Sequence, residues 1–102
     1  MASKATEALA TVQEGIAHRV ASREANGVKA REASPVTDEQ TLVEFACECT
    51  NMDCDRSITV PLYVYRRLLQ AGDQYLLQAR HHAFASYRTI VATGLMRIEE
   101  RV

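Results

Sequence analysis

The first third of the chain carries its larger apolar residues at a helical period. Four of them are separated by steps of three or four residues: Leu9, Val12, Ile16 and Val20. This spacing places them in one narrow stripe on a single face of a helix. The segment contains no proline and consists mostly of Ala, Glu, Arg, Gln and Lys, which favour helix. Residues 1–33 are therefore predicted to form a helical arm, with a bend or break at Asn26-Gly27.

A proline and several short polar residues follow, so residues 34–41 are predicted to be a linker. Beyond the linker, residues 41–47 and 57–60 are rich in β-branched and apolar residues and predict two short strands. Residues 61–72 begin with proline and end with glycine, which is typical of a helix. The apolar positions of this helix share one face: Leu62, Tyr65, Leu68 and Leu69.

The last part of the chain predicts further strands. Residues 75–79 follow Gly72-Asp73 and are expected to form a short strand, while 87–93 and 95–102 flank Gly94 as a terminal hairpin. The predicted fold class is α+β, with a long N-terminal helix and a small core, residues 42–102, of short antiparallel strands around one helix.

Composition describes one small soluble domain. The chain has 102 residues, is 47% hydrophobic and 25% charged, and carries a formal net charge of -1. A core of this size buries little apolar surface and is expected to need a staple such as a metal ion. No run approaches the ~18 apolar residues of a membrane span, and the N-terminus lacks the apolar segment of a signal peptide, so a cytoplasmic location is expected.

Three closely spaced cysteines are the strongest chemical signal in the sequence. Cys47, Cys49 and Cys54 lie where a predicted strand passes into a polar loop. Zinc prefers four tetrahedral sulfur or nitrogen ligands, and this arrangement lets three thiols converge. Because His18 lies in the arm, the fourth ligand is expected to be His81 or His82. The alternative is that the cysteines are buried small hydrophobes and the histidines belong to a solvated turn.

These residues resemble a family of small uncharacterised bacterial proteins, mainly actinobacterial. Phe45, Cys47-Glu48-Cys49 and Cys54 match its F-x-C-E-C-x4-C motif, and the family carries a G-H-E motif downstream. The spacing from Tyr75 places His81 on the family's histidine, which implies the ligand set Cys47, Cys49, Cys54 and His81. Where the family has Pro-Gly before this histidine the chain has Ala79-Arg80, so His82 stays a competing ligand.

A closed set of four ligands leaves no position for water, so one structural zinc ion per chain is predicted and no enzymatic activity. Glu48 lies between two ligands on a strand and is expected to point away from the metal, where it cannot act as a base.

The predicted function is a regulatory or protein-interaction module whose helical arm binds a protein partner or a second copy of the chain. One alternative is nucleic-acid binding through four arginines interleaved with tyrosines: Arg66, Arg67, Arg80 and Arg88. The net charge of -1 counts against it. A second alternative is a thiol redox switch that releases zinc on oxidation.

Overall fold

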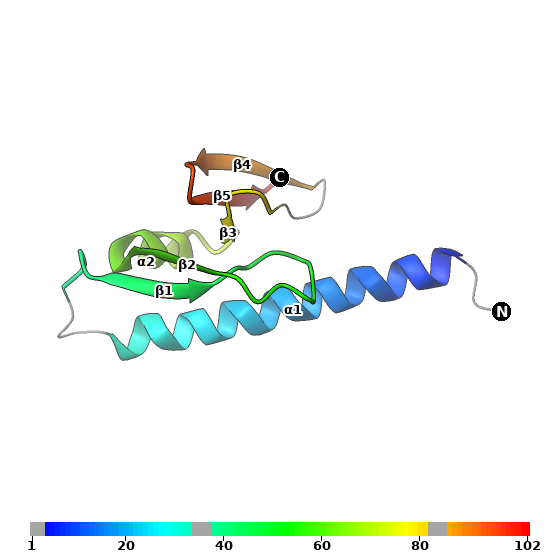
Figure 1. Cartoon of the computed structure of the whole chain (residues 1–102), viewed down its shortest axis with the longest axis horizontal. Helices are drawn as coiled ribbons and strands as arrows, with labels where there is room; N and C mark the ends of the chain where they lie inside the picture. The colour runs from blue at the N-terminus through cyan, green and yellow to red at the C-terminus, as the bar shows by residue number, and fades with distance from the viewer. Residues whose placement is uncertain (1–3, 34–37, 82–85) are drawn as a thin grey trace.

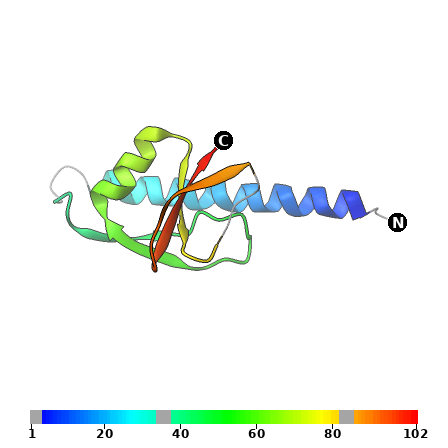
Figure 2. The same cartoon turned by 90° about the horizontal axis from the view of Figure 1, so that it is seen from above.

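The computed structural model describes residues 4–33, 38–81 and 86–102, with side chains from residue 12 onward. The predicted α+β class is confirmed. Helix α1 (Lys4–Glu32) corresponds to the predicted arm, and its N-terminal part extends past both sheets (Figures 1 and 2). Residues 34–37 of the predicted linker lie outside the described part of the chain. No helix within the described residues is long and apolar enough to cross a membrane.

The first two strands form a hairpin beside α1. Strand β1 (Leu42–Ala46) pairs antiparallel with β2 (Ser57–Pro61), so that Phe45 lies opposite Ile58. Helix α2 (Leu62–Ala71) follows directly and ends at Gly72, whose φ of 84° is a left-handed conformation that glycine adopts without strain. These elements lie where the sequence predicts them.

The remaining strands form a second antiparallel sheet in the order β3-β5-β4. In Figure 1 this sheet lies above the hairpin and α2, on the side opposite α1. Strand β3 (Gln74–Gln78) pairs with β5 (Met96–Arg101), and β5 pairs with β4 (Tyr87–Ala92). The predicted terminal hairpin is thus confirmed, and β3 and β4 are the two edges of the sheet.

The core lies between the hairpin, α2 and the second sheet. Its centre is the stack of Phe45 on Tyr65, with ring centroids 4.2 Å apart and planes 18° from parallel. The large side chains that are at least 99% buried come from both sheets and from α2: Phe45, Leu62, Tyr65, Leu68, Leu76 and Leu77. Apart from Leu69, which is half-buried against this core, the predicted apolar face of α2 is fully inside.

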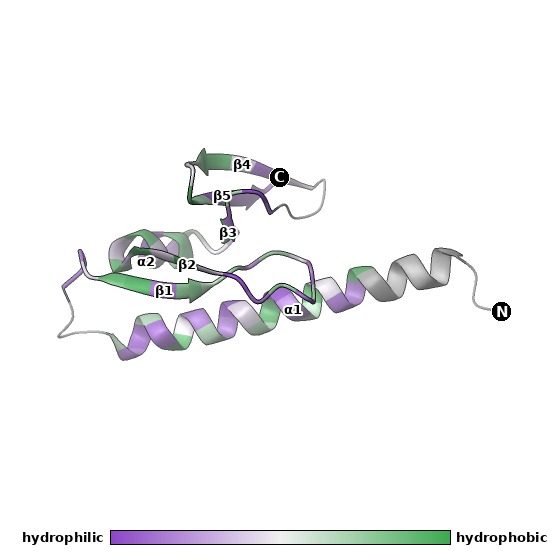
Figure 3. Ribbon diagram, viewed as in Figure 1, coloured by the Kyte–Doolittle hydropathy of each residue, from purple (hydrophilic) through white to green (hydrophobic). Residues whose placement is uncertain are grey.

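Helix α1 meets the rest of the protein through a polar and small-residue face. The buried residues of this face recur at helical spacing: Gly15, Arg19, Ser22, Asn26 and Ala30. The apolar stripe points elsewhere, since Val12, Ile16 and Val20 are 38%, 47% and 50% exposed. In Figure 3 hydrophilic and hydrophobic residues alternate along α1, whereas β1 is mostly hydrophobic. The side chain of Leu9 lies outside the described residues.

The predicted break at Asn26-Gly27 is wrong, because α1 runs through both residues without interruption. Asparagine disfavours helix interiors when its side chain competes for the local backbone. Here the Asn26 side chain bonds instead to the backbone of Ala46 on β1. The tertiary contact therefore removes the competition.

Gly15 marks the closest approach of α1 to the loop after β1, and its substitution makes a test of this packing. A Cβ atom at Gly15 would overlap the carbonyl oxygen of Thr50, which is backbone and cannot swing aside. Gly15→Ala is therefore expected to lower the free energy of unfolding by about 1–3 kcal/mol, as overpacking does. Urea denaturation followed by circular dichroism measures the change.

Gly27→Ala is the matched control on the same helix. Its Cβ would meet only the tip of the Arg31 side chain at 3.8 Å. Alanine favours helix over glycine by up to about 1 kcal/mol, so this variant is expected to be stabilised. Equal stabilisation by Gly15→Ala would contradict the packing of α1 on Thr50.

Candidate metal centre

Three thiols and one imidazole converge at the end of the β1–β2 hairpin. The candidate ligand atoms of Cys47, Cys49, Cys54 and His81 all lie within 4.8 Å of one another. The Nδ1 atom of His81 is 3.4 Å from the sulfur of Cys47 and 3.5 Å from that of Cys54. A tetrahedral zinc ion with Zn–S bonds of about 2.3 Å holds its ligand atoms roughly 3.3–3.8 Å apart. The cluster therefore fits a four-coordinate metal ion.

Backbone contacts hold each ligand in place. Cys47 follows β1 and its N–H donates to the carbonyl of Arg56, which extends the hairpin by one bond of 2.9 Å. The loop then turns back at Asn51, whose side chain accepts from the N–H of Asp53 at 3.0 Å and whose carbonyl accepts from Cys54. This turn returns Cys54 to the other two thiols.

The second sheet supplies the fourth ligand. His81 follows β3, and its N–H donates to the carbonyl of Gln78 at 2.9 Å. The N–H of Gln78 in turn donates to the sulfur of Cys47 at 3.2 Å. A metal ion at this point would bridge the hairpin and the second sheet.

The cluster favours a positive ion. Cys47 and Cys49 are 98% and 99% buried, while Cys54 and His81 are half-buried. A hydrogen bond with Cys47 lowers the pKa of the Cys49 thiol, and the same bond together with burial raises the pKa of Cys47 far above its usual value. Burial likewise raises the pKa of Cys54. These shifts favour the protonated thiols of Cys47 and Cys54, so all three cysteines would become thiolates only with a cation among them, as metal coordination supplies.

The residues brought together are those that the sequence nominated. His18 is not part of the cluster, as expected for a residue of the arm. His82 lies outside the described residues, so the choice between His81 and His82 stays a prediction.

Alanine variants of the two histidines measure that choice. His81→Ala is expected to weaken zinc retention strongly, because the variant keeps only three protein ligands and water replaces the fourth. His82→Ala is expected to retain zinc nearly as well as the natural chain. Competition with a chromogenic chelator ranks the variants, and the reverse order would move the ligand to His82.

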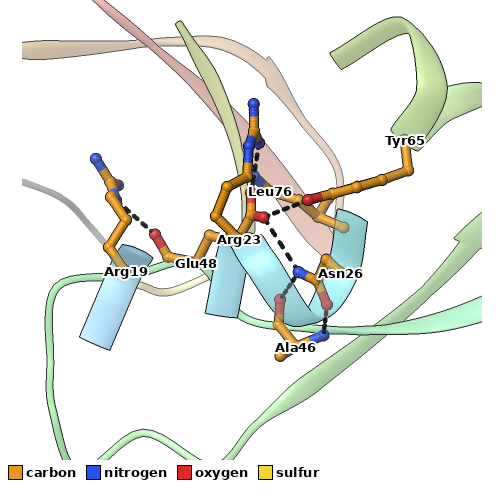
Figure 4. A network of polar contacts seen from close by, with 7 residues as sticks. All are labelled: Arg19, Arg23, Asn26, Ala46, Glu48, Tyr65 and Leu76. Atoms are coloured by element: carbon orange, nitrogen blue, oxygen red, sulfur yellow. Dashed lines mark hydrogen bonds and ion pairs between the residues drawn. The ribbon is translucent and has the colours of Figure 1, made fainter. Parts of the chain in front are cut away.

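Glu48 lies between two ligands yet faces the opposite way, toward α1 (Figure 4). Its carboxylate is fully buried and accepts four hydrogen bonds. Oε1 accepts from Arg23 at 3.0 Å and from the N–H of Leu76 at 2.9 Å. Oε2 accepts from Asn26 at 3.1 Å and from the hydroxyl of Tyr65 at 2.5 Å. The carboxylate thus joins α1, α2 and β3 to the segment after β1 that carries Cys47 and Cys49.

The backbone on both sides of Glu48 is also held. Its N–H donates to the carbonyl of Leu76 at 2.8 Å, and its carbonyl accepts from Nε of Arg19 at 2.8 Å. Asn26 donates to the carbonyl of Ala46 and accepts from its N–H, both at 2.8 Å, so its amide pairs with β1 as another strand would. Burial, and then the Glu48 charge, raises the pKa of Tyr65 well above its usual value, which keeps this hydroxyl a donor.

This network was not predicted from the sequence. Glu48 was expected to point away from the metal with no role as a base, and Asn26-Gly27 was expected to bend or break the helix. A usable signal was present, because Arg19, Arg23 and Asn26 are four and three residues apart and share one helix face. A buried acid on a strand needs such a set of donors.

The residues of the nucleic-acid alternative are dispersed among other contacts. Tyr65 is buried in the core. Arg66 pairs with Glu39, and Arg88 pairs with Glu100 at 2.7 Å. These pairs lower the positive charge that the two arginines offer to a phosphate backbone.

No protein-family model, no curated protein and no solved structure matched the chain in the three comparisons.

Proposed function

We propose that the protein is a small non-catalytic zinc module, in which one ion held by Cys47, Cys49, Cys54 and His81 stabilises the fold. The observation that carries the proposal is the convergence of four donor atoms within 4.8 Å. Three cysteines and a histidine form a donor set that zinc prefers, and structural zinc sites use all four positions. The ligands come from the segment between β1 and β2 and from the residues after β3, so the ion would join the two sheets and add folding free energy directly.

Two features support a structural rather than a catalytic ion. Four protein ligands leave no coordination position for water or substrate. The carboxylate of Glu48, which lies between two candidate ligands in the sequence, is buried and already accepts four hydrogen bonds from α1, α2 and β3. It therefore has no free lone pair facing the metal with which to move a proton.

Metal analysis tests the proposal. Protein purified without added chelator is expected to contain close to one zinc ion per chain, measured by plasma mass spectrometry against the protein concentration. Replacement by cobalt is expected to give the thiolate-to-metal absorption of a tetrahedral sulfur-rich site. Clearly substoichiometric metal, together with a fold that is indifferent to a chelator, would reject the site.

The interaction part of the proposal rests on α1. Its stripe of Val12, Ile16 and Val20 is about 40–50% exposed although the helix docks on its own core. Such a stripe on a projecting helix suits a protein partner or the same helix of a second copy.

A charged double variant separates association from folding. Val12→Glu combined with Ile16→Glu is expected to abolish self-association or partner binding, because both side chains lie outside the core. Zinc content and thermal midpoint should remain those of the natural chain. Sedimentation velocity reads the oligomeric state, and a natural chain that is monomeric at all accessible concentrations would remove the self-association part of the proposal.

A further inference from the structure

The guanidinium of Arg19 is buried without a counter-ion. Arg19 is only 5% exposed, and its Nη1 and Nη2 atoms have no hydrogen-bond partner among the described residues. Its Nε donates to a neutral carbonyl, that of Glu48, while the Glu48 carboxylate itself pairs with Arg23. Buried arginines are almost always paired, because an unpaired charge away from water is strongly unfavourable. An acceptor is therefore expected at this position.

Aromatic rings flank the same guanidinium. Its central carbon lies 4.1 Å from the centre of the Tyr75 ring and 4.5 Å from that of Tyr87. The two rings meet edge to face, with centroids 5.7 Å apart. Ring faces attract the cation and hold it in place, but they accept none of its strong hydrogen bonds in the way an oxyanion does. The contacts therefore orient Arg19 and leave its two buried Nη atoms without an acceptor among the described residues.

Arg19 lines a cleft of about 450 Å³ between α1 and the second sheet. Arg23 and Arg101 line it as well, against a single acid, Glu24. Arg101 is exposed and has no ion-pair partner among the residues that the structure describes. The carboxylate of Glu48 already neutralises Arg23. Arg19 and Arg101 against Glu24 still give the cleft a net positive charge.

Apolar surface forms the rest of the cleft. Ile16 and Val20, the exposed stripe residues of α1, line it together with the rings of Tyr75 and Tyr87. The hydroxyl groups of Thr50 and Ser86 also belong to residues of its wall. A volume of this size with apolar walls and a few convergent polar groups is typical of a small-molecule site.

We propose that this cleft binds a small organic oxyanion, a phosphate monoester or a carboxylate that carries a flat apolar body. The oxyanion accepts from Arg19 and Arg101, and the apolar body lies against Ile16, Val20 and the Tyr87 ring. A planar guanidinium matches two oxygens of either acid group, and this geometry favours such ligands over halide ions. The site shares no residue with the zinc ligands, so it stands independently of the proposed zinc function, but it shares Ile16 and Val20 with the stripe proposed for association.

Calorimetric titration of the zinc-loaded full chain with three probes tests the proposal. Phenyl phosphate or benzoate is expected to bind saturably at one site per chain, and inorganic phosphate is expected to bind more weakly because it lacks the apolar body. The stronger of the first two identifies the acid group. The absence of saturable binding by all three at millimolar concentration would overturn the proposal.

Variants locate the site. Arg19→Gln is expected to weaken binding of the stronger probe by at least about tenfold, as the loss of a charge-assisted bond does. Arg101→Gln, at the exposed rim, is expected to weaken it severalfold. Arg31→Gln removes the same charge from an exposed position of α1 outside the cleft and should leave the affinity unchanged. Equal weakening by Arg31→Gln and Arg101→Gln would show non-specific attraction and overturn the site.

One further variant keeps the test independent of α1, because Arg19 also contacts Glu48 and its loss affects folding. Tyr87→Leu on the edge strand β4 removes a ring but leaves the helix untouched. It is expected to weaken phenyl phosphate or benzoate severalfold and to leave inorganic phosphate nearly unchanged. Unaltered affinity for the aromatic probes in this variant would overturn the placement of the ligand. Zinc content, measured in parallel, separates a failed cleft from a failed metal centre.

Discussion

Cys47→Ser is expected to release zinc and to leave the chain unfolded at 25 °C. Cys47 is embedded in the fold, because it directly follows β1, is 98% buried and its sulfur accepts from the N–H of Gln78 in the second sheet. Small domains retain only about 5–15 kcal/mol of net stability, and binding of a structural zinc ion contributes on the order of 10 kcal/mol to folding. Loss of one ligand therefore removes most of what holds the fold.

Circular dichroism and metal content measure this outcome together. Met52→Ser is the control, since it changes an exposed residue of the same loop that is not a ligand; it is expected to keep both zinc and fold. An excess of a strong chelator should reproduce the Cys47→Ser spectrum with the natural chain. Native zinc content or a native thermal midpoint in Cys47→Ser would exclude Cys47 as a structural ligand.

Glu48→Ala is expected to lower the free energy of unfolding by about 3–5 kcal/mol, which is the cost of breaking a buried ion pair. The substitution leaves four donors without an acceptor: those of Arg23, Asn26, Tyr65 and Leu76. Each unsatisfied buried group adds its own desolvation cost. Because Glu48 joins α1 to the segment after β1 that carries Cys47 and Cys49, the variant should also lose zinc more readily.

Glu44→Ala is the matched control, on β1, which leads into Glu48. Its carboxylate is exposed and, within the part of the chain that the structure describes, accepts only from the hydroxyl of Ser57, so a change within about 0.5 kcal/mol is expected. Glu48→Gln should fall between the two, because an amide keeps the shape but replaces one acceptor oxygen by a donor. Urea denaturation at fixed zinc concentration measures all three. A cost for Glu48→Ala no larger than that for Glu44→Ala would show that the network contributes nothing to stability.

The secondary-structure elements and the candidate ligands could be predicted from the sequence, because most of them depend on the order of residues over short stretches of chain. Period-two alternation in 42–46, the proline and glycine that bracket α2, and the turn at Gly94 act over a few residues. The three cysteines are close in the chain, so a single turn brings them together whatever the rest of the fold does. His81 needed more, since it is 27 residues beyond Cys54, and only the family resemblance distinguished it from its neighbour.

The face through which α1 packs on the core could not be predicted from the sequence, for a physical reason. Hydrophobic periodicity locates a buried face when burial is apolar, but here Arg19, Ser22 and Asn26 are buried and Val12, Ile16 and Val20 are exposed. The division into arm and core stays a prediction. The hydrogen bonds from α1 to Glu48 and Ala46 nevertheless make the helix a contributor to core stability.

The sequence by itself determined the helices, the strands and the cluster of sulfur ligands, because each follows from spacing over short stretches of chain. Only the tertiary structure decided which face of α1 is buried, which groups satisfy Glu48 and where Arg19 is held. These features depend on polar atoms from residues 17 to 29 positions apart in the chain, such as Tyr65 and Glu48 at 17 and Arg19 and Glu48 at 29. A hydrogen bond at that range depends on the positions of both elements in space, which no one-dimensional pattern contains.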